Sequence, residues 1–235
     1  MLKRVLLKVS GEALCVEGGF GIDFDALEKI VENIKTIVSC GVELAVVIGA
    51  GNIVRGKDLC AQGVSRVKAD NIGMVATIIN ALVLQDELLR QGIGANVLST
   101  FYIYQVVEPY VVDKCVEYLK DKRIVILSGG TGSPHFTTDT AAALRAAEIN
   151  ADMLLKATKV DGVYSDDPDV NKDAKKFDRL SYMDVLNKDL KVMDATAVTL
   201  CMDNDIPIVV FNMNVTQNFQ NIVNGETVGT YIGSM

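Results

Sequence analysis

Short runs of apolar, mostly β-branched residues alternate with longer segments of helical periodicity along the chain of 235 residues. Such runs are typical of strands buried on both faces, as in parallel sheets. The expected strands are Val5–Val9, Val42–Ile48, Asn96–Ser99, Arg123–Leu127, Asp152–Lys156, Pro207–Phe211 and Val228–Ile232. The expected helices are Phe24–Val38, Asp70–Arg90, Asp113–Lys120, Thr140–Ala147 and Ala195–Met202. The alternation predicts an α/β three-layer sandwich, in which a central, mainly parallel sheet is flanked by helices.

A glycine-rich loop, Ser128–Asp139, joins one of these strands to the helix that follows. Its glycines allow backbone amides to approach a ligand, and free amides together with the helix dipole favour an anion. The alternative is a long turn of glycine and threonine, capped by Asp139, that binds nothing.

Two further strands end in glycine loops. Ser10-Gly11 follows the first strand, and Gly49–Asn52 follows the second, with Arg55 close behind. The second loop suggests a dinucleotide fingerprint, but the position of the third glycine holds Val54. A GxxxxGK[ST] phosphate loop is also absent. These loops therefore indicate an anion site of neither common nucleotide-binding type.

Two of the expected strands carry a lysine near their carboxyl end, Lys8 and Lys156. A buried ammonium group is costly unless it reaches a partner or water, and a long stem can also carry it out to solvent. Because ligands of open α/β sheets bind at the carboxyl edge, two such lysines favour a shared anion site. Asp194 and Asp70 are expected at the starts of two helices, where each could serve only that helix.

Composition excludes several classes of protein. A net charge of −7 argues against a nucleic-acid partner, which would need a basic face. The five cysteines are scattered, which indicates reduced thiols, and the single histidine, His135, cannot support a metal cluster or a Ser-His-Asp triad, so no metal ligand is assigned. Lys8 interrupts the apolar start, and no run of about 18 apolar residues follows, so neither a signal peptide nor a membrane partner is expected. The protein is expected in the cytoplasm.

The segment after Asp152 adds a hairpin, Lys159–Tyr164, expected to turn at Asp161-Gly162. It could form a lobe that holds a nucleotide. Glycine loops, strand-end lysines, Arg55 and an aspartate at one sheet edge are suited to phosphoryl transfer, where catalysis is mostly positioning and charge neutralisation. The acceptor is not defined by these features.

Six segments, in this order, resemble motifs of the bacterial uridylate (UMP) kinases, a family of the amino acid kinase superfamily. They are Lys8–Leu14, Gly49–Asn52 with Arg55-Gly56, Thr131–Asp139, Lys156–Tyr164, Lys191–Asp194 and Phe211–Asn214. The resemblance extends from Lys3 to about Ile232. It implies one amino acid kinase-like domain over residues 1–235, with an acceptor-binding half at about 1–151 and an ATP-binding half at about 152–235.

The implied reaction transfers the γ-phosphate of ATP to UMP, with Mg²⁺ bound to ATP, and gives UDP for pyrimidine nucleotide biosynthesis. Lys8 and Lys156 would act on the phosphates, and Asp194 would orient both lysines. ATP-binding roles are implied for Lys8, Val9, Ser10, Gly11, Gly51, Arg55, Thr158, Tyr164 and Asp167. UMP-binding roles are implied for Ala50, Asp70, Thr131, Gly132, Ser133, Pro134, His135, Phe136, Thr137 and Thr138.

The chain departs from the family pattern at Ala50, where a glycine is usual, and at Ser133 and His135, which replace asparagine and phenylalanine. The resemblance further implies a homohexamer that GTP activates, through a stretch matching Val16–Gly21, and that UTP inhibits. The GTP-binding pattern has arginine and histidine where this chain has Gln85, Leu89 and Asn96, which argues against GTP activation.

Two rival functions share much of this pattern. Kinases of the same superfamily that phosphorylate a carboxylate or carbamate have both lysines but not the Thr131–Asp139 loop beside Asp70. Storage or nucleotide-sensing proteins on the same fold, similar to the molybdenum-storage proteins, do not catalyse turnover. Retention of both lysines and Asp194 favours an enzyme.

Overall fold

The structure is a computed structural model that describes residues 2–16, 18–168 and 170–234. Its strands are β1 (Arg4–Val9), β2 (Glu43–Ile48), β3 (Ala95–Ser99), β4 (Glu108–Pro109), β5 (Ile124–Ser128), β6 (Met153–Thr158), β7 (Val163–Tyr164), β8 (Lys176–Phe177), β9 (Arg179–Ser181), β10 (Ile208–Asn212) and β11 (Thr230–Gly233). Its helices are α1 (Phe24–Ser39), α2 (Gly56–Ala61), α3 (Arg66–Arg90), α4 (Val112–Lys120), α5 (Thr138–Glu148), α6 (Tyr182–Asn187), α7 (Ala195–Asp203) and α8 (Gln217–Val223), with a 3-10 turn, η1 (Gly11–Leu14).

Nine strands form one sheet in the order β4-β3-β5-β2-β1-β6-β10-β11-β9. Neighbouring strands are parallel except β10 and β11, which are antiparallel. The short strands β7 and β8 pair separately. The predicted α/β class and mainly parallel sheet are therefore confirmed.

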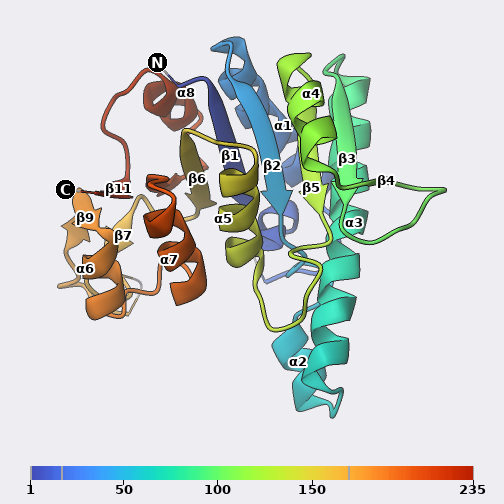
Figure 1. Ribbon diagram of the computed structural model, residues 1–235. Coiled ribbons are helices and arrows are strands. Elements are labelled where there is room, and N and C mark those ends of the chain that lie inside the picture. Colours follow the sequence, from blue (N-terminus) through green and yellow to red (C-terminus); the bar gives the residue numbers. More distant parts are fainter. Residues whose placement is uncertain (1, 17, 169, 235) are drawn as a thin grey trace.

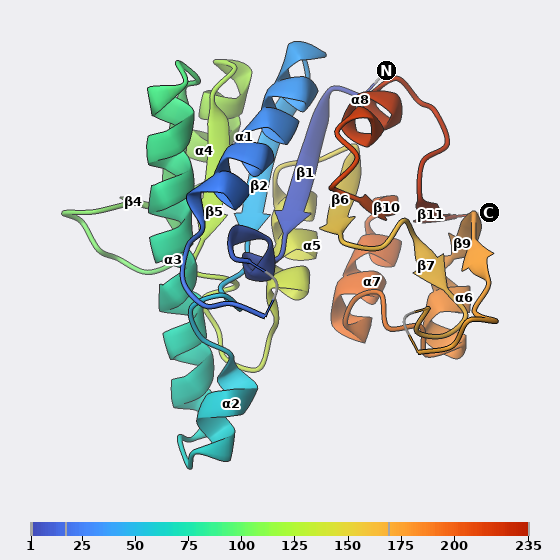
Figure 2. The same cartoon turned by 180° about the vertical axis from the view of Figure 1, so that it is seen from behind.

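Helices cover both faces of the sheet, so the fold has three layers. Figure 1 shows α4, α5 and α7 in front of the sheet, and Figure 2 shows α1, α3 and α8 on the opposite face. A separate apolar core lies on each side, one built with α1, α3 and α8 and the other with α4 to α7. In both views α2 and the first turns of α3 extend past the carboxyl ends of the central strands.

The alternation of side chains along β1 determines which residues face which layer. Leu7 and its odd-numbered neighbours pack in the core beneath α1, and Leu6 packs in the opposite core. Lys8 follows the parity of Leu6 and points towards α5 and α7. In β6, Lys156 has the parity of Leu154, which belongs to the same core as Leu6. Strand geometry thus directs both lysines to one face.

Several local predictions are corrected by the structure. Helix α3 begins at Arg66, so Asp70 lies in its second turn and not its first. The cap of α5 is Thr137, whose hydroxyl accepts from the amides of Asp139 and Thr140, so Asp139 is not the cap. Asp161-Gly162 is not a hairpin turn, because β7 pairs with β8, beyond Ser165. Local sequence patterns do not define where a helix starts or which strand a short strand pairs with, because both depend on packing against other parts of the chain.

Short elements were the ones not expected from the sequence. They are α2, α6, α8, β4, β8 and β9. Each is too short for a period of 3.6 or 2 to stand out from neighbouring loops, and their stability comes from packing on longer elements.

One described helix, α3, would pass as a membrane span by length and composition alone, with a mean hydropathy of 1.5 over 18 residues. Its inner side packs on the sheet, where Ile78, Leu84 and Leu88 are part of the core beneath α1. Contacts with β3 and β5 run along the helix. Core packing therefore accounts for one side of α3, whereas Val67, Ile72, Val75, Ile79 and Leu89 on this helix are exposed.

All five cysteines are free thiols, as the sequence predicted. Cys115 and Cys201 are buried, and burial raises the pKa of each to about 12. These two thiols are therefore protonated at neutral pH and behave as small apolar side chains.

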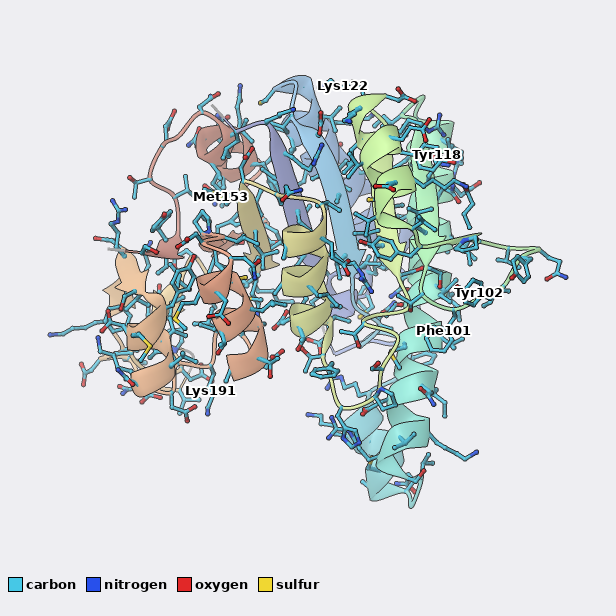
Figure 3. All side chains as sticks on the ribbon, in the orientation of Figure 1. Phe101, Tyr102, Tyr118, Lys122, Met153 and Lys191 are labelled. Carbon is cyan, nitrogen blue, oxygen red and sulfur yellow. The ribbon has the colours of Figure 1, made fainter. Side chains whose placement is uncertain are left out.

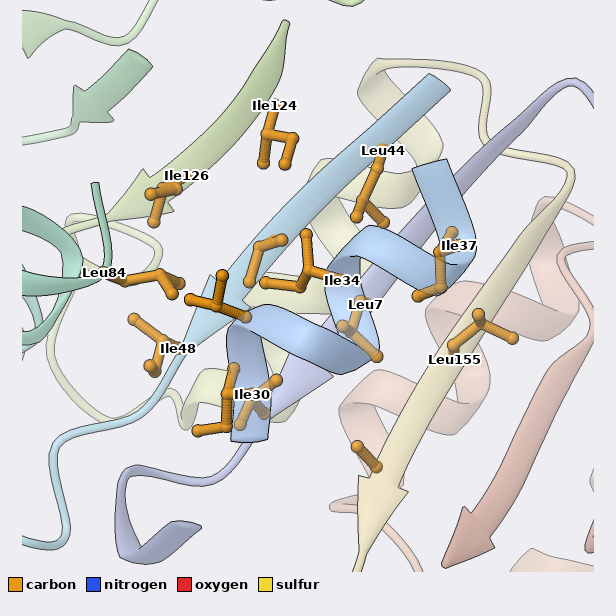
Figure 4. Packing of buried hydrophobic residues seen from close by; sticks show 14 of the residues in the cluster. Leu7, Ile30, Ile34, Ile37, Leu44, Ile48, Leu84, Ile124, Ile126 and Leu155 are labelled. Carbon is orange, nitrogen blue, oxygen red and sulfur yellow. The ribbon is translucent and has the colours of Figure 1, made fainter. Parts of the chain in front are cut away.

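The core beneath α1 offers a test of the packing. Ile34 is fully buried between α1 and the sheet, near Leu7 and Leu44 (Figure 4). We expect Ile34→Ala to lower the free energy of unfolding by about 2–5 kcal/mol, because it removes apolar contacts and leaves a cavity. Lys35→Ala, an exposed neighbour, should change it by less than about 0.5 kcal/mol. Denaturant titration of both variants checks this, and equal losses would contradict it.

Candidate active site

The two strand-end lysines lie side by side on the sheet. β1 and β6 are adjacent and parallel, and Lys8 is the direct register partner of Lys156. Their side chains are only 10% and 13% exposed. Like charges directly opposite each other repel, so two buried ammonium groups require a counter-charge.

Asp139, in the first turn of α5, supplies that charge. Its two carboxylate oxygens contact the two lysines, Oδ1 at 2.7 Å from Lys8 Nζ and Oδ2 at 2.8 Å from Lys156 Nζ. Burial opposes ionisation of this carboxyl, but the two ammonium groups outweigh it and the pKa of Asp139 is lowered. Burial lowers the pKa of Lys156, and Lys8 lowers it further, whereas Asp139 raises it. Lys156 also donates to the carbonyl of Val192.

Asp194 was expected to orient the lysines, but its direct partners are different. It caps α7 by accepting from Ala197 N at 2.9 Å. It also accepts from the hydroxyls of Thr137, at 2.5 Å, and Thr140, at 2.9 Å. Asp194 therefore joins the start of α7 to the start of α5, and it lies near enough to Lys156 to raise the pKa of that lysine slightly.

A cavity of about 160 Å³ lies beside the start of α5. Six residues with an expected binding role line it: Ala50, Gly51, Asp70, Phe136, Thr137 and Thr138. The other lining residues are Val54, Gly56, Ala69, Gly73, Met74, Thr77 and Gly130. Thr131, Gly132, Ser133, Pro134 and His135 do not line it, so this part of the loop is not brought to the cavity.

Asp70 was expected to bind a ribose, and in the structure its carboxylate has partners within the protein. It accepts from Arg66 Nε at 2.7 Å and from the backbone amide of His135 at 2.8 Å. Burial would raise the pKa of Asp70, but these hydrogen bonds and the charge of Arg66 lower it overall. The backbone of His135 has a φ of 73°. Asp70 therefore ties the outer part of the glycine loop to α3.

A larger cavity of about 550 Å³ lies on the other side. Lys156 and the expected ATP-binding residues Thr158, Tyr164 and Asp167 all line it. The remaining lining residues are Val160, Gly162, Val163, Ser165, Asp166, Pro168, Lys188–Val192 and Val210. Figure 3 shows Lys191, from this wall, and Phe101, whose ring lies beside Gly129, on opposite sides of α5. Lys156 thus lies at the larger cavity, and Thr137 and Thr138, next to Asp139 in the chain, lie at the smaller one.

The other expected ATP-binding residues have different environments. The side chain of Val9 is buried in the core, so only its backbone can contact a ligand. Ser10 caps η1 through its hydroxyl. Arg55 forms an ion pair with Glu12 at 2.7 Å, with both side chains nearly half exposed, so this guanidinium can exchange partners.

Asp139 is the residue that sequence reasoning missed. A signal was present, since it ends the Thr131–Asp139 motif and begins the helix after the glycine loop. Its pairing with two lysines depends on how α5 packs on β1 and β6, which no local pattern shows. The wall formed by Lys188–Val192 was missed for the same reason.

A comparison with protein-family models matches residues 3–212 to the amino acid kinase family. The chain belongs to this family. The fold is therefore that of this family, and the chain is a kinase.

Solved structures give closer likenesses. The chain is similar to a UMP kinase from Bacillus anthracis, with 41% identity, a TM-score of 0.96, and 99% and 96% of the two chains covered. It is similar to a UMP kinase from Ureaplasma parvum, with 33% identity, a TM-score of 0.91 and 100% of both chains covered. A uridylate kinase from Archaeoglobus fulgidus has 32% identity and a TM-score of 0.75, over 99% of this chain and 100% of its own.

The carboxylate between the lysines predicts a shift in the pH dependence of turnover. Asp139→Asn removes the charge that raises the pKa of Lys156, so the alkaline limb of kcat should move to lower pH. At neutral pH we expect kcat to fall about 100-fold, because the lysines are no longer held in place. A pH–rate profile checks this, with Asp203→Asn, on the exposed end of α7, as the control. An unmoved alkaline limb would contradict the assignment.

Proposed function

We propose that this protein is a UMP kinase, which transfers the γ-phosphoryl group of ATP to UMP in pyrimidine nucleotide biosynthesis. The observation that carries the proposal is the Lys8–Asp139–Lys156 cluster, with a large cavity at Lys156 and a smaller one at the start of α5, in a chain that is 41% identical to a UMP kinase over nearly its full length. A phosphate oxygen of UMP attacks the γ-phosphorus, the bond to the β–γ bridging oxygen breaks, and ADP leaves.

The two cavities support a division of labour between the halves of the chain. ATP would occupy the larger cavity, lined by residues between Lys156 and Val210, and UMP the smaller one, lined by residues between Ala50 and Thr138. This fits an acceptor-binding half at about 1–151 and an ATP-binding half at about 152–235. Thr131–His135 would reach UMP only if the loop closes over it.

Each polar group of the cluster would have a distinct role. Lys8 and Lys156 neutralise the charge that builds up on the transferring group, while Asp139 fixes their separation. Asp194 orients the start of α5, and with it Asp139, through Thr137 and Thr140. No general base is needed, because the attacking phosphate oxygen is already ionised.

Magnesium is proposed as part of the ATP complex. Among the described residues no group of three or more His, Cys, Asp or Glu side chains could hold a metal ion. Mg²⁺ keeps several waters and binds mainly to substrate phosphates, so it does not require a cage of protein ligands. When bound with ATP it would neutralise phosphate charge. Asp139, which contacts both lysines, and Asp194, near Lys156, are the carboxylates that would face it.

We also propose a cytoplasmic homohexamer that UTP inhibits and GTP does not activate. The side chains at the three positions of the GTP pattern are neutral. Gln85 donates to Ala95 O at 3.1 Å, and Asn96 donates to Glu108 Oε1 at 3.0 Å, so both are engaged within the chain. Of the associated Val16–Gly21 stretch, residue 17 lies outside the described residues.

A panel of acceptors tests the proposed activity. With ATP and Mg²⁺ we expect turnover of UMP and little of CMP or AMP, because the chain is 41% identical to a UMP kinase, and little of glutamate or carbamate, because the smaller cavity would hold a nucleotide acceptor. Added GTP should leave the rate unchanged. ADP release measures each reaction. Activity only with glutamate or carbamate would identify a carboxylate or carbamate kinase, and ATP binding without any turnover would identify a storage or sensing protein.

Lys156 provides a test of the chemical step. We expect Lys156→Ala to lower kcat by about 100-fold or more and to change the Kd of UMP little, because its charge is needed most in the transition state. Steady-state kinetics and calorimetric titration with UMP check the two quantities. Lys122→Ala, at the opposite end of the sheet in Figure 3, is the control. A variant with unchanged kcat would show that Lys156 has another role.

A further inference from the structure

Two asparagine side chains pair with each other inside the protein. Asn52, in the loop after β2, and Asn80, in the middle of α3, are both 0% exposed. Asn52 Nδ2 donates to Asn80 Oδ1 at 3.1 Å, and Asn80 Nδ2 donates back to Asn52 Oδ1 at 2.8 Å. The two amides therefore form a closed ring of hydrogen bonds between a glycine loop and a helix.

Each amide of this pair also holds a backbone carbonyl. Asn80 Nδ2 donates to Gly49 O at 2.7 Å, and Asn52 Nδ2 donates to Gly21 O at 2.8 Å. All four polar side-chain atoms thus have partners, as buried amides require, since an unpaired one costs about 1–3 kcal/mol. Two leucines would fill a similar volume without this requirement. The distinctive property of the asparagine pair is its hold on the two carbonyls.

The pair determines where the Gly49–Gly51 loop lies. Gly49 is held on both sides, because its amide donates to Val9 O at 2.9 Å and its carbonyl accepts from Asn80. The next two amides, of Ala50 and Gly51, have no hydrogen-bond partner among the described residues. Both residues line the smaller cavity. Their amides are therefore available to a phosphate group.

The same pair fixes the end of β1 relative to this loop. A β-carbon placed at Gly11 would lie 2.6 Å from Asn52 Oδ1 and 2.6 Å from Gly51 N. The backbone that follows Lys8 therefore packs directly on Asn52 and on the free amide of Gly51. Asn52 and Asn80 thus connect the loop amides to the strand that carries one of the two lysines.

We propose that the Asn52–Asn80 pair is a positioning device for phosphoryl transfer. It sets the Ala50 and Gly51 amides at a fixed place beside Lys8, although neither asparagine needs to touch a substrate. The inference rests on the proposed UMP kinase activity. Because positioning accounts for much of the catalysis of phosphoryl transfer, a small displacement of these amides should lower kcat more than it weakens substrate binding.

Asn80→Asp tests the proposal with almost no change in shape. An ionised carboxylate cannot donate to Gly49 O or Asn52 Oδ1 and repels both, whereas the protonated acid can donate to one of them. We expect kcat to fall about 100-fold at pH 8, with KM for UMP changed by no more than about threefold. As the pH is lowered towards 5, kcat should recover relative to that of the unmodified protein, because the acid regains a donor.

Asn33→Asp is the matched control. Asn33 is another buried asparagine, 4% exposed, and its Nδ2 donates to Met213 O at 2.9 Å, away from the glycine loops. The two substitutions are chemically identical and both remove a bond to a backbone carbonyl. Asn33→Asp should therefore lose stability without the fall in kcat and without its recovery at low pH. Thermal unfolding of both variants shows how far stability is matched.

The double variant Asn52→Leu with Asn80→Leu covers the case in which a buried carboxylate prevents folding. It introduces no buried charge, and it removes the amide donors to both Gly49 O and Gly21 O, so its kcat should also fall about 100-fold. Wild-type kcat in both the Asn80→Asp and double variants would overturn the positioning role of the pair and leave the proposed UMP kinase activity intact. Loss of folded protein in both would assign the pair to stability and overturn it as well. If the unmodified protein does not turn over UMP, the proposed function fails first.

Discussion

The attraction of two buried lysines to one carboxylate is the interaction on which the site depends. Lys8 and Lys156 face each other across β1 and β6, so their charges would repel without Asp139 between them. Desolvating three charged groups costs several kcal/mol for each, which attraction repays only at close range. The cluster is thus a preorganised group with a net positive charge, and a phosphoryl group in transfer brings the negative charge that it lacks.

The parallel sheet makes this arrangement possible. Adjacent parallel strands present residues of equal register on the same face, so a lysine near the end of each strand is delivered to one point. The helix that covers this point, α5, begins where the glycine loop ends, and its first turn carries Asp139. Backbone amides at a helix start favour a carboxylate there, so the loop, the helix and the ion cluster are parts of one structural unit.

Helix α3 organises the glycine loops in a comparable way. Asp70 holds the amide of His135, and Thr77 accepts from Gly129 N at 2.8 Å, so one side of this helix fixes two points of the glycine loop. Asn80, one turn further, holds Gly49. The loops at the sheet edge are therefore held by polar side chains of a helix that also contributes Ile78, Leu84 and Leu88 to the apolar core.

The sequence by itself determined the fold class, the long elements, the convergence of Lys8 and Lys156, and the resemblance to a kinase family. The first two follow from hydrophobic periodicity, the third from the common carboxyl edge of parallel strands, and the resemblance rests on six sequence motifs. Only the tertiary structure decided that Asp139, and not Asp194, contacts both lysines, and that Asn52 pairs with Asn80. It also decided the starts of α3 and α5 and the pairing of β7. Such partners are distant in the chain, and their contacts depend on how layers pack, which periodicity does not encode.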